Sequence, residues 1–290
     1  MTRTALIVLL GCLLGVFIGS TRWSNIAEEP LVQTDGQGYY AYLPAVIIYH
    51  DLSFGFVEEI NQKYYPESKR AQFIHATPNG NVNKYFSGTA LLQAPFFLAA
   101  HGMAEIKDGY SPIYQKAVGV AAIFYLTLVI WFLSGFLLAF GFRPWPTALT
   151  ILGVVFGTNL LHYSLYEPSM SHVYSFCMVS AFMFFIRRTT DESGYKYLVC
   201  ASTALGITAL IRPTNALIVL ALPALLGGLT QTLMWSETQF RDNTSRLILS
   251  ALMFAIVVCI QPLIYWLQTR STIVWSYGEA GLRFFNREVF

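Results

Sequence analysis

Two carboxylates, Asp35 and Glu167, stand in short polar turns of a largely apolar chain. Asp35 opens the stretch DGQGYYAY, in which two nearby glycines allow a tight turn and a close approach to a ligand. A carboxylate held there can accept a proton from an attacking hydroxyl and so act as a general base. The same residue would equally serve as a helix N-cap, accepting hydrogen bonds from free backbone N–H groups.

Glu167 lies in the segment YEPSMSH and precedes Pro168, a residue that favours the first position of a helix. Its carboxylate would there complement the dipole of the next helix. Close to Asp35 it would instead orient an acceptor or help hold a divalent cation, a cofactor that the sequence leaves open. His172 follows five residues later, either as a satisfied polar residue between helices or as a substrate contact. No HxxH or HExxH spacing supports a zinc site.

Arg212 stands between two apolar segments and precedes Pro213, so a helix break is predicted at this point. A guanidinium group suits bidentate phosphate binding, although an interfacial arginine that reaches toward water has the same surroundings. Lys84 offers a second cation for the same anion, or an ordinary interface anchor. The candidate substrate-binding residues are Arg212, Lys84, Tyr85, His172, Tyr39 and Tyr40.

The composition indicates a polytopic membrane protein. Of the 290 residues, 55% are hydrophobic and only 12% are charged, whereas charged residues make up about 25% of a typical soluble domain. The formal net charge of +2 is too small to indicate a nucleic-acid partner. The sequence contains no P-loop, dinucleotide-binding glycine motif or serine nucleophile elbow. A phosphate bound by these cations therefore belongs more plausibly to a lipid than to a soluble nucleotide.

The predicted fold class is all-α, a bundle of about seven transmembrane helices that forms a single membrane domain over residues 1–290. Each span should need about 20 apolar residues to cross a bilayer. The candidate spans lack Asp, Glu, Lys and Arg, and they cover residues 4–20, 117–141, 147–165, 171–186, 197–211, 214–233 and 247–267.

Lysine and arginine in the connecting loops predict the orientation, because cytoplasmic loops carry an excess of these residues. The loop cations are Arg3, Arg143, Arg187, Arg188, Lys196, Arg241 and Arg246. They share one side only if the apolar stretch 88–104 does not cross the membrane, so this stretch is predicted to be a juxtamembrane or re-entrant helix. Residues 39–50 should form a second interfacial helix. The first outer loop then covers 21–115, and residues 268–290 form an outer tail.

Six segments occur in a consistent order along about residues 1–280: DGQGYYAYLPAVIIYHDLSF, KYFSGTALLQAPFFLAAH, DGYSPIYQ, EPSMSHVYSF, IRPTN and WSYGE. Together they resemble bacterial integral-membrane glycosyltransferases of the GT-C class. These enzymes are relatives of protein O-mannosyltransferases and of the aminoarabinose transferase that modifies lipid A. Juxtamembrane helices in the first outer loop are also a feature of this family.

The resemblance implies a sugar donor linked to polyprenyl or dolichyl phosphate. It also implies inverting transfer to a glycan, lipid or protein acceptor on the outer side of the plasma or inner membrane. The catalytic base of the family maps onto Asp35, and its second acidic residue maps onto Glu167. The phosphate-binding cations map onto Lys84 and Arg212.

Members of this class usually continue for several more membrane helices, so the resemblance also implies a fragment or a truncated relative. The main alternative is a non-enzymatic lipid-carrier transporter or membrane assembly subunit that uses the same cations. A proton-coupled transporter would carry acidic residues in mid-helix, and the long apolar segments lack them, which favours the enzyme. For an enzyme, we expect Asp35, Glu167 and Arg212 to line one cavity.

Overall fold

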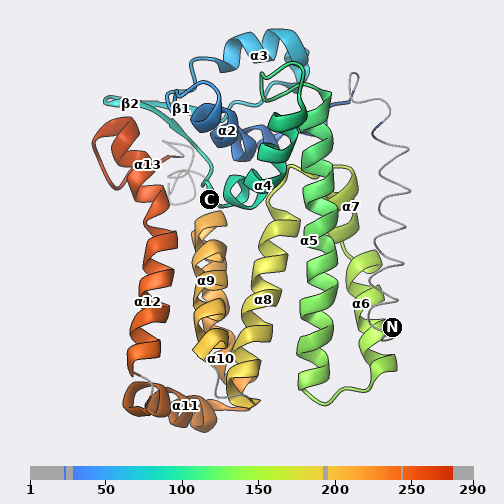
Figure 1. Ribbon diagram of the computed structural model, residues 1–290, viewed down its shortest axis with the longest axis vertical. Helices are drawn as coiled ribbons and strands as arrows, with labels where there is room; N and C mark the ends of the chain where they lie inside the picture. Colours follow the sequence, from blue (N-terminus) through green and yellow to red (C-terminus); the bar gives the residue numbers. More distant parts are fainter. Residues whose placement is uncertain (1–22, 24–28, 192–194, 243, 277–290) are drawn as a thin grey trace, which may run out of the picture.

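The computed structural model describes Trp23 and residues 29–191, 195–242 and 244–276, and these residues are mostly helical. Figure 1 shows two layers. The upper layer, here called the cap, consists of residues 30–111, and the lower layer, the bundle, consists of residues 112–258. The predicted first span at 4–20 and residues 277–290 of the predicted tail lie outside the described residues.

The cap contains short helices and one β-hairpin. Its elements are α2 (Asp35–Ile47), α3 (Val57–Tyr64), the 3₁₀ turn η2 (Glu67–Lys69), β1 (Ile74–Thr77), β2 (Gly80–Asn83) and α4 (Gly88–Met103). The strands pair antiparallel, with Ile74 opposite Asn83 and Thr77 opposite Gly80. The Asn-Gly turn signal at Asn79 closes this hairpin. The predicted helical fold class is therefore confirmed in its main part: the described chain is mostly helical, and these two short strands are the exception.

The core of the cap is rich in tyrosine. Phenol groups can be buried with little cost only when each hydroxyl finds a partner. Tyr40 donates to the carbonyl oxygen of Gly109, and Tyr42 donates to that of Tyr85 at 2.7 Å. These bonds join residues far apart in the sequence, so they fix the cap elements relative to one another. The aromatic residues of this core include Tyr40, Tyr42, Tyr65, Tyr110, Tyr114, Phe54, Phe56, Phe73 and Phe97.

The bundle consists of helices that run between the cap and the opposite end of the molecule. Its elements are α5 (Pro112–Ala139), α6 (Pro144–Gly157), α7 (Leu160–Leu165), α8 (His172–Asp191), α9 (Tyr195–Ile211), the 3₁₀ helix η3 (Pro213–Ala221), α10 (Leu222–Leu226), α11 (Leu229–Asp242) and α12 (Thr244–Val258). Helix α5 packs against α8, α8 against α9 and α9 against α12 (Figure 1). A final helix, α13 (Ile260–Thr269), continues α12 up to the hairpin of the cap.

Within the described residues, two helices are long and apolar enough to cross a membrane. They are α5, with 28 residues, and the combined α12 and α13, with 26 residues from Thr244 to Thr269. At about 1.5 Å per residue, both exceed the roughly 30 Å of a hydrocarbon core. A third span results if the bent pair formed by η3–α10 and α11 is counted as one. A bundle of seven spans is therefore not confirmed.

The other predicted spans differ from continuous membrane-length helices for identifiable reasons. The stretch 147–165 breaks at Thr158 and Asn159, between α6 and α7. The stretch 197–211 corresponds to α9, whose 17 residues reach only about 25 Å. The stretch 171–186 corresponds to α8, which has 20 residues and ends in the charged sequence RRTTD. The stretch 214–233 bends by 106° near Gly227.

The stretches 39–50 and 88–104 both contain helices. Helix α2 starts four residues earlier than expected, at Asp35, and α4 begins at Gly88. Helix α4 lies between the two layers and packs against α2 in the cap and against α5 and α9 in the bundle. The position of both helices relative to a membrane stays a prediction.

Candidate functional site

A cavity of about 540 Å³ lies where the cap meets the bundle. Three segments far apart in the sequence line it: the start of α2, the loop before α4, and the break between α9 and η3. The lining residues are Asp35, Tyr39, Tyr85, Phe86, Ile211, Arg212, Pro213 and Thr214. Four of the predicted functional residues therefore line the same space, and they include the charged pair Asp35 and Arg212.

Close backbone packing at two glycines brings these segments together. A Cβ atom on Gly36 would lie 2.0 Å from the Oγ of Ser169, and one on Gly88 would lie 2.4 Å from the backbone N of Ile211. Larger side chains would therefore separate α2 from the turn before α8, and α4 from the end of α9. The close approach predicted at the glycines after Asp35 exists, but the neighbour is this protein and not a ligand.

Asp35 is the first residue of α2. The N-cap position belongs to Thr34, which has a φ of 50° and whose side chain makes no capping bond, so the alternative role of Asp35 as the N-cap was wrong. The side chain of Asp35 is exposed, and within the described part of the chain its carboxylate has no hydrogen-bond or ion-pair partner. It lies in the first turn of α2, at the positive end of the helix dipole.

Arg212 lies at the predicted helix break, in extended conformation between α9 and η3. Its Nη2 donates a hydrogen bond to the Oη of Tyr39 at 3.0 Å. The ring of Tyr39 in turn packs against Tyr85, with 4.6 Å between the ring centroids. Among the described residues, no carboxylate pairs with the guanidinium group of Arg212. Most of its N–H donors therefore stay open to an anion in the cavity.

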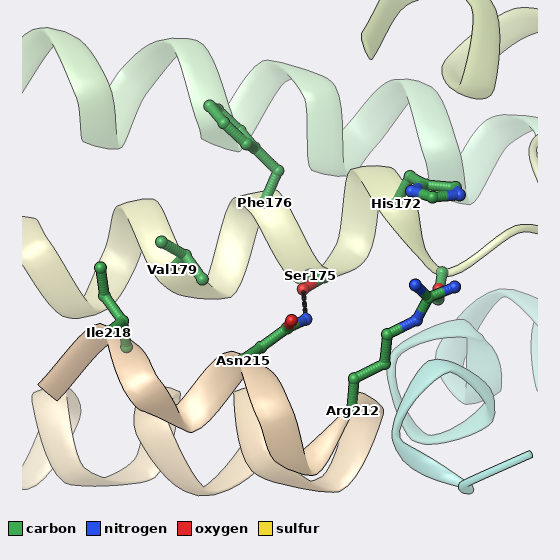
Figure 2. A pocket seen from close by; sticks show the side chains of 8 residues that line it. His172, Ser175, Phe176, Val179, Arg212, Asn215 and Ile218 are labelled. Atoms are coloured by element: carbon green, nitrogen blue, oxygen red, sulfur yellow. Dashed lines mark hydrogen bonds between the residues drawn. The ribbon is translucent and has the colours of Figure 1, made fainter. Parts of the chain in front are cut away.

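A second cavity of about 380 Å³ shares Arg212 with the first (Figure 2). Its polar lining includes His172, Ser175 and Asn215, and the Nδ2 of Asn215 donates to the Oγ of Ser175 at 2.6 Å. Its apolar lining comes from Phe176, Val179 and Ile218, farther down α8 and η3. The second cavity therefore has a charged end at Arg212 and an apolar wall on α8 and η3.

His172 lies between the two charges of the site. Its ring stacks on Tyr163, with 3.8 Å between the ring centroids, and it is half-buried. The charges of Arg212 and Asp35 both act on the imidazole. Its predicted contact with a substrate is therefore compatible with its position, as is a purely structural role in stacking.

Glu167 does not line either cavity. Its Oε1 lies 4.0 Å from the Nε2 of His162. Pro168 is not the first helical residue as expected, because α8 starts only at His172. The turn that carries Glu167 does reach the site, since Ser169 contacts Gly36. The expectation that three charged groups line one cavity thus holds for Asp35 and Arg212 and was wrong for Glu167.

Lys84 and Tyr40 do not line either cavity. The Nζ of Lys84 donates to the carbonyl oxygen of Gln72 at 2.8 Å, which fixes the loop after β2. Tyr40 is fully buried among Phe97 and Tyr110 in the cap core. The predicted substrate contact of Tyr40 was therefore wrong. Tyr39 and Tyr85 do line the cavity, and their substrate contacts stay predictions.

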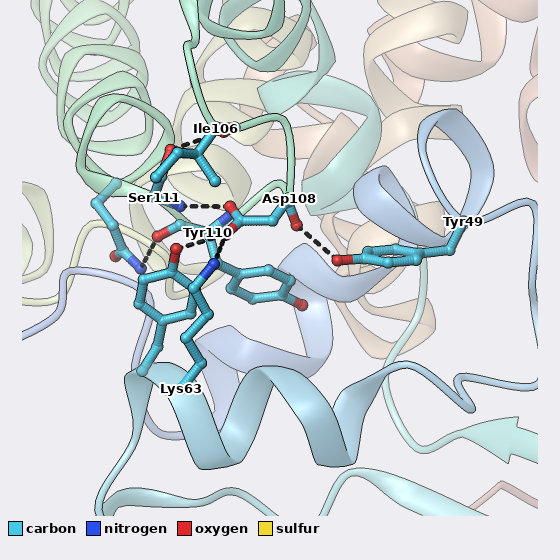
Figure 3. A network of polar contacts seen from close by, with 8 residues as sticks. Tyr49, Lys63, Ile106, Asp108, Tyr110 and Ser111 are labelled. Carbon is cyan, nitrogen blue, oxygen red and sulfur yellow. Dashed lines mark hydrogen bonds and ion pairs between the residues drawn. The ribbon is translucent and has the colours of Figure 1, made fainter.

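The sequence reasoning missed the network around Asp108 (Figure 3). One carboxylate oxygen accepts bonds from the backbone N–H groups of Tyr110 and Ser111, both at 2.9 Å. The other accepts from Lys63 at 2.8 Å and from the hydroxyl of Tyr64. Burial acts to raise the pKa of Asp108, but these hydrogen bonds outweigh it and hold the pKa below its ordinary value. The segment DGYSP contained the signal, because an aspartate before a turn commonly accepts such bonds.

The Asp108 network also fixes α2. Tyr49, just after α2, donates to the carbonyl oxygen of Asp108 at 3.1 Å, and Tyr40 on α2 donates to that of Gly109. The loop before α5 therefore holds the helix whose first residue is Asp35. Asp108 does not line the cavity itself, and it affects the cavity through the position of α2.

No metal-binding cluster is evident in the ranges that the structure describes, where no group of three or more His, Cys, Asp or Glu residues is placed to hold an ion. Comparisons of the chain with protein-family models, with curated proteins and with solved structures gave no match. What the site can do is therefore inferred from its own residues: an unpaired carboxylate and a guanidinium with open donors face one cavity.

Proposed function

We propose that this protein is a membrane-embedded glycosyltransferase that moves a sugar from a polyprenyl-phosphate-linked donor to an acceptor. The observation that carries the proposal is the shared cavity of Asp35 and Arg212. An acid that can take a proton and a cation that can hold a phosphate are the two groups that such a transfer requires. The resemblance of the six sequence segments to GT-C enzymes supports the same reaction.

In this mechanism, Asp35 accepts the proton of an acceptor hydroxyl or amine as that group attacks the anomeric carbon of the sugar. The new bond to the sugar forms while the bond between the anomeric carbon and the phosphate oxygen breaks. The electron pair of the broken bond stays on the phosphate, where Arg212 stabilises the developing charge. A single displacement inverts the configuration at the anomeric carbon.

The second cavity supports a donor that carries a lipid. Its polar groups lie beside Arg212, and its lower wall is formed by Phe176, Val179 and Ile218. A lipid phosphate bound at Arg212 can extend its hydrocarbon chain along this apolar wall, whereas a soluble sugar nucleotide would leave the wall unused. His172 and Asn215 then contact the donor near its phosphate.

The proposed placement is in the plasma or inner membrane, with the cavity on the outer side. Helices α5 and α12–α13 serve as full spans. The segment 4–20 together with α6, α8, α9 and η3–α10 would complete a polytopic bundle of about seven membrane segments, the shorter ones relying on packing within the bundle. The cap, with α2 and α4, then lies at the outer surface.

Lys84 and Glu167 have secondary roles in this proposal. Either would reach the substrates only after a rearrangement, because Lys84 is bonded to Gln72 and Glu167 lies beside His162. The acceptor is a glycan, a lipid or a protein, and a requirement for a divalent cation is tested by comparing transfer in magnesium with transfer in a chelator.

The decisive experiment measures transfer from radiolabelled polyprenyl-phosphate sugars in membranes that contain the full chain or its variants. We expect Asp35→Asn to lower the rate by about 10²–10⁴, the usual contribution of a general base. We expect Arg212→Ala to weaken donor use by about 10²–10³, as for the loss of one donor to a developing oxyanion. Glu167→Gln is the matched control carboxylate and should keep most of the activity.

The results separate the enzyme from its alternative. Full transfer by Asp35→Asn would exclude Asp35 as the base. Donor binding that needs Arg212, without any labelled product from the wild-type chain, would instead favour a lipid-carrier transporter or assembly subunit. The anomeric configuration of the product, determined by NMR, must be opposite to that of the donor.

A further inference from the structure

Helix α11 lies at the end of the bundle opposite the cap, and its direction is set by two glycines. Gly227 and Gly228 both have positive φ, 95° and 134°. The N–H of Gly228 donates to the carbonyl oxygen of Pro223 at 2.6 Å, which ends α10. The chain then turns by 106° into α11. Since residues with a Cβ rarely adopt these angles, the sequence itself encodes the turn and prevents one straight span.

Helix α11 is amphipathic. Leu229, Leu233 and Phe240 fall within about 40° of one another around the helix axis and form one stripe, here called the apolar stripe. Their exposed fractions are 66%, 61% and 68%. The exposed polar residues Gln231 and Thr238 lie on the opposite side of the helix. Large apolar side chains exposed along one side of a helix mark a surface that can contact a partner or a membrane.

The inner side of α11 is already attached to the bundle. The Nε1 of Trp235 donates to the Oγ1 of Thr189 near the end of α8 at 3.1 Å, and its ring packs against the bundle core. This contact keeps α11 across the lower end of the bundle, as Figure 1 shows. The apolar stripe therefore cannot be buried by rotating the helix without breaking this contact.

Large apolar side chains are also exposed on α12, the helix that follows α11. Helix α12 starts at Thr244 and exposes Ile248, Leu252 and Ile256. Only 17% of the most apolar window of α12–α13 is buried inside the protein, although this helix is long enough to cross a membrane. Apolar side chains exposed on a membrane-length helix fit the hydrocarbon core of a bilayer, and those exposed on the helix that crosses its end fit the interface of the same bilayer.

Charge at this end fits the headgroups of that interface. Among the loops and helix ends at this end of the bundle, the sequence places six Lys or Arg and four Asp or Glu residues; the cations are Arg143, Arg187, Arg188, Lys196, Arg241 and Arg246. A cationic excess at a membrane surface favours anionic lipids. A second protein would not explain why the apolar surface extends along the full length of α12.

We propose that α11 is an in-plane helix whose apolar stripe rests in the headgroup region of a bilayer that contains anionic lipid. The inference rests on the membrane placement in the proposed function but not on glycosyl transfer. It replaces the lower part of the predicted span 214–233 by a surface helix on the side opposite the Asp35 cavity.

The test uses fluorescent NBD labels on single cysteines in the full chain, with Cys12, Cys177, Cys200 and Cys259 replaced by alanine. The vesicles contain phosphatidylcholine and phosphatidylglycerol, with nitroxide quenchers either at the headgroup or deep in the acyl chain. Leu233→Cys reports the apolar stripe, Thr238→Cys is its matched control on the opposite side, and Leu252→Cys reports α12. Phe240→Cys repeats the first measurement if Leu233→Cys does not fold.

We expect headgroup nitroxides to quench the Leu233 label at least about twofold more than the Thr238 label, as for a helix that lies in the interface. The Leu252 label should be quenched most by the deep nitroxide. Equal quenching at Leu233 and Thr238, or strongest quenching of Leu233 by the deep nitroxide, would overturn the in-plane assignment alone. If neither nitroxide quenches the Leu252 label, the membrane placement is wrong, and so is the in-plane assignment of α11 that depends on it. The transfer assay would still test the role of Asp35 independently.

Discussion

The cap and the bundle are held together by different kinds of contact. In the cap, tyrosine hydroxyls bind backbone carbonyls in distant parts of the chain, as between Tyr40 and Gly109. In the bundle, most of the hydroxyls that donate a hydrogen bond donate it to the carbonyl four residues earlier in their own helix, as Thr208 donates to Ala204 at 2.8 Å. The bundle core is otherwise apolar, and its outer surface exposes large aliphatic side chains.

This difference matters because the cavity lies between the two regions. The cap supplies Asp35, Tyr39 and Tyr85, whereas the bundle supplies Arg212. Specific bonds in the cap fix where the carboxylate lies, and packing in the bundle fixes where the guanidinium lies. Changes at the contact between the regions should therefore have the largest effects, cap bonds intermediate effects, and intrahelical bonds in the bundle the smallest.

The largest effect is expected at Gly88, where α4 of the cap meets the end of α9. In Gly88→Ala, the new Cβ would lie 2.4 Å from the backbone N of Ile211, so α4 must move. We expect a loss of about 2–3 kcal/mol in the free energy of unfolding, the cost of overpacking a tight contact. Thermal unfolding of the purified chain in detergent measures the loss, and transfer should fall with it because Arg212 follows Ile211.

Gly102→Ala is the matched control, since it lies in the same helix and its Cβ would meet nothing within 4 Å. It should leave stability unchanged or raise it by up to about 1 kcal/mol, because alanine favours a helix over glycine. Equal destabilisation by the two variants would mean that the contact between cap and bundle is not the sensitive point.

The features of this contact that follow a local sequence rule could be predicted. Pro213 predicts the helix break at which Arg212 faces the cavity. The glycines after Asp35 predict that the backbone of this segment approaches a neighbour closely. The long apolar run of α5 likewise predicts a helix of membrane length. Each of these signals depends on a few neighbouring residues, so a single sequence is enough to read it.

The direction of each side chain could not be predicted in the same way. Tyr39 and Tyr40 are neighbours, yet about 100° of helical rotation places one at the cavity and the other in the core. Lys84 binds Gln72 across the hairpin, and Glu167 lies beside His162, because tertiary packing decides which partner each charge meets. Asp108 was missed since its partners Lys63 and Tyr64 lie more than forty residues earlier.

The next largest effect is expected at Asp108 in the cap. Asp108→Asn removes the negative charge and replaces one acceptor oxygen by an NH2 group, so the Asn side chain cannot accept all four bonds that join α3 to the loop before α5. We expect a cost of about 1–3 kcal/mol in unfolding free energy. Asp51→Asn is the control, because the half-buried Asp51 carboxylate binds, within the described part of the chain, only the nearby N–H groups of Ser53 and Gly55. Chemical denaturation should show a clearly smaller loss for Asp51→Asn; similar losses would remove the distinction between long-range and local bonds.

Acid should reveal the same network in the wild-type chain. The pKa of Asp108 is lower in the folded protein than its ordinary value of 3.8. Its contribution to stability is therefore complete above that ordinary value and is lost as the pH falls through the lowered one. Denaturation curves between neutral pH and about pH 2 should fall less steeply for Asp108→Asn than for the wild type. Parallel curves would mean that this carboxylate does not contribute.

A smaller effect is expected from Tyr39→Phe, which removes the hydroxyl that accepts the bond from Arg212 while keeping the ring against Tyr85. The stability cost should be about 0.5–1.5 kcal/mol, the net value of one hydrogen bond. The KM for the lipid-linked donor should rise, since Arg212 loses the group that orients it. Tyr42→Phe, whose hydroxyl binds the carbonyl of Tyr85, is the control and should change stability with little effect on KM. An unchanged KM in Tyr39→Phe would limit this bond to a structural role.

The smallest effect is expected at Thr208, a fully buried residue of α9 in the bundle. Thr208→Val keeps the shape of the side chain and removes a bond that only returns to its own helix, so stability should change by less than about 0.5 kcal/mol. Tyr40→Phe is the counterpart in the cap, where the lost hydroxyl leaves the Gly109 carbonyl without its partner; we expect a cost of about 1–2 kcal/mol. Thermal unfolding of the two variants under identical conditions compares one buried hydroxyl from each region. If Thr208→Val costs as much as Tyr40→Phe, hydroxyls position the bundle as strongly as the cap, and the positions of Asp35 and Arg212 would then depend on the same kind of contact.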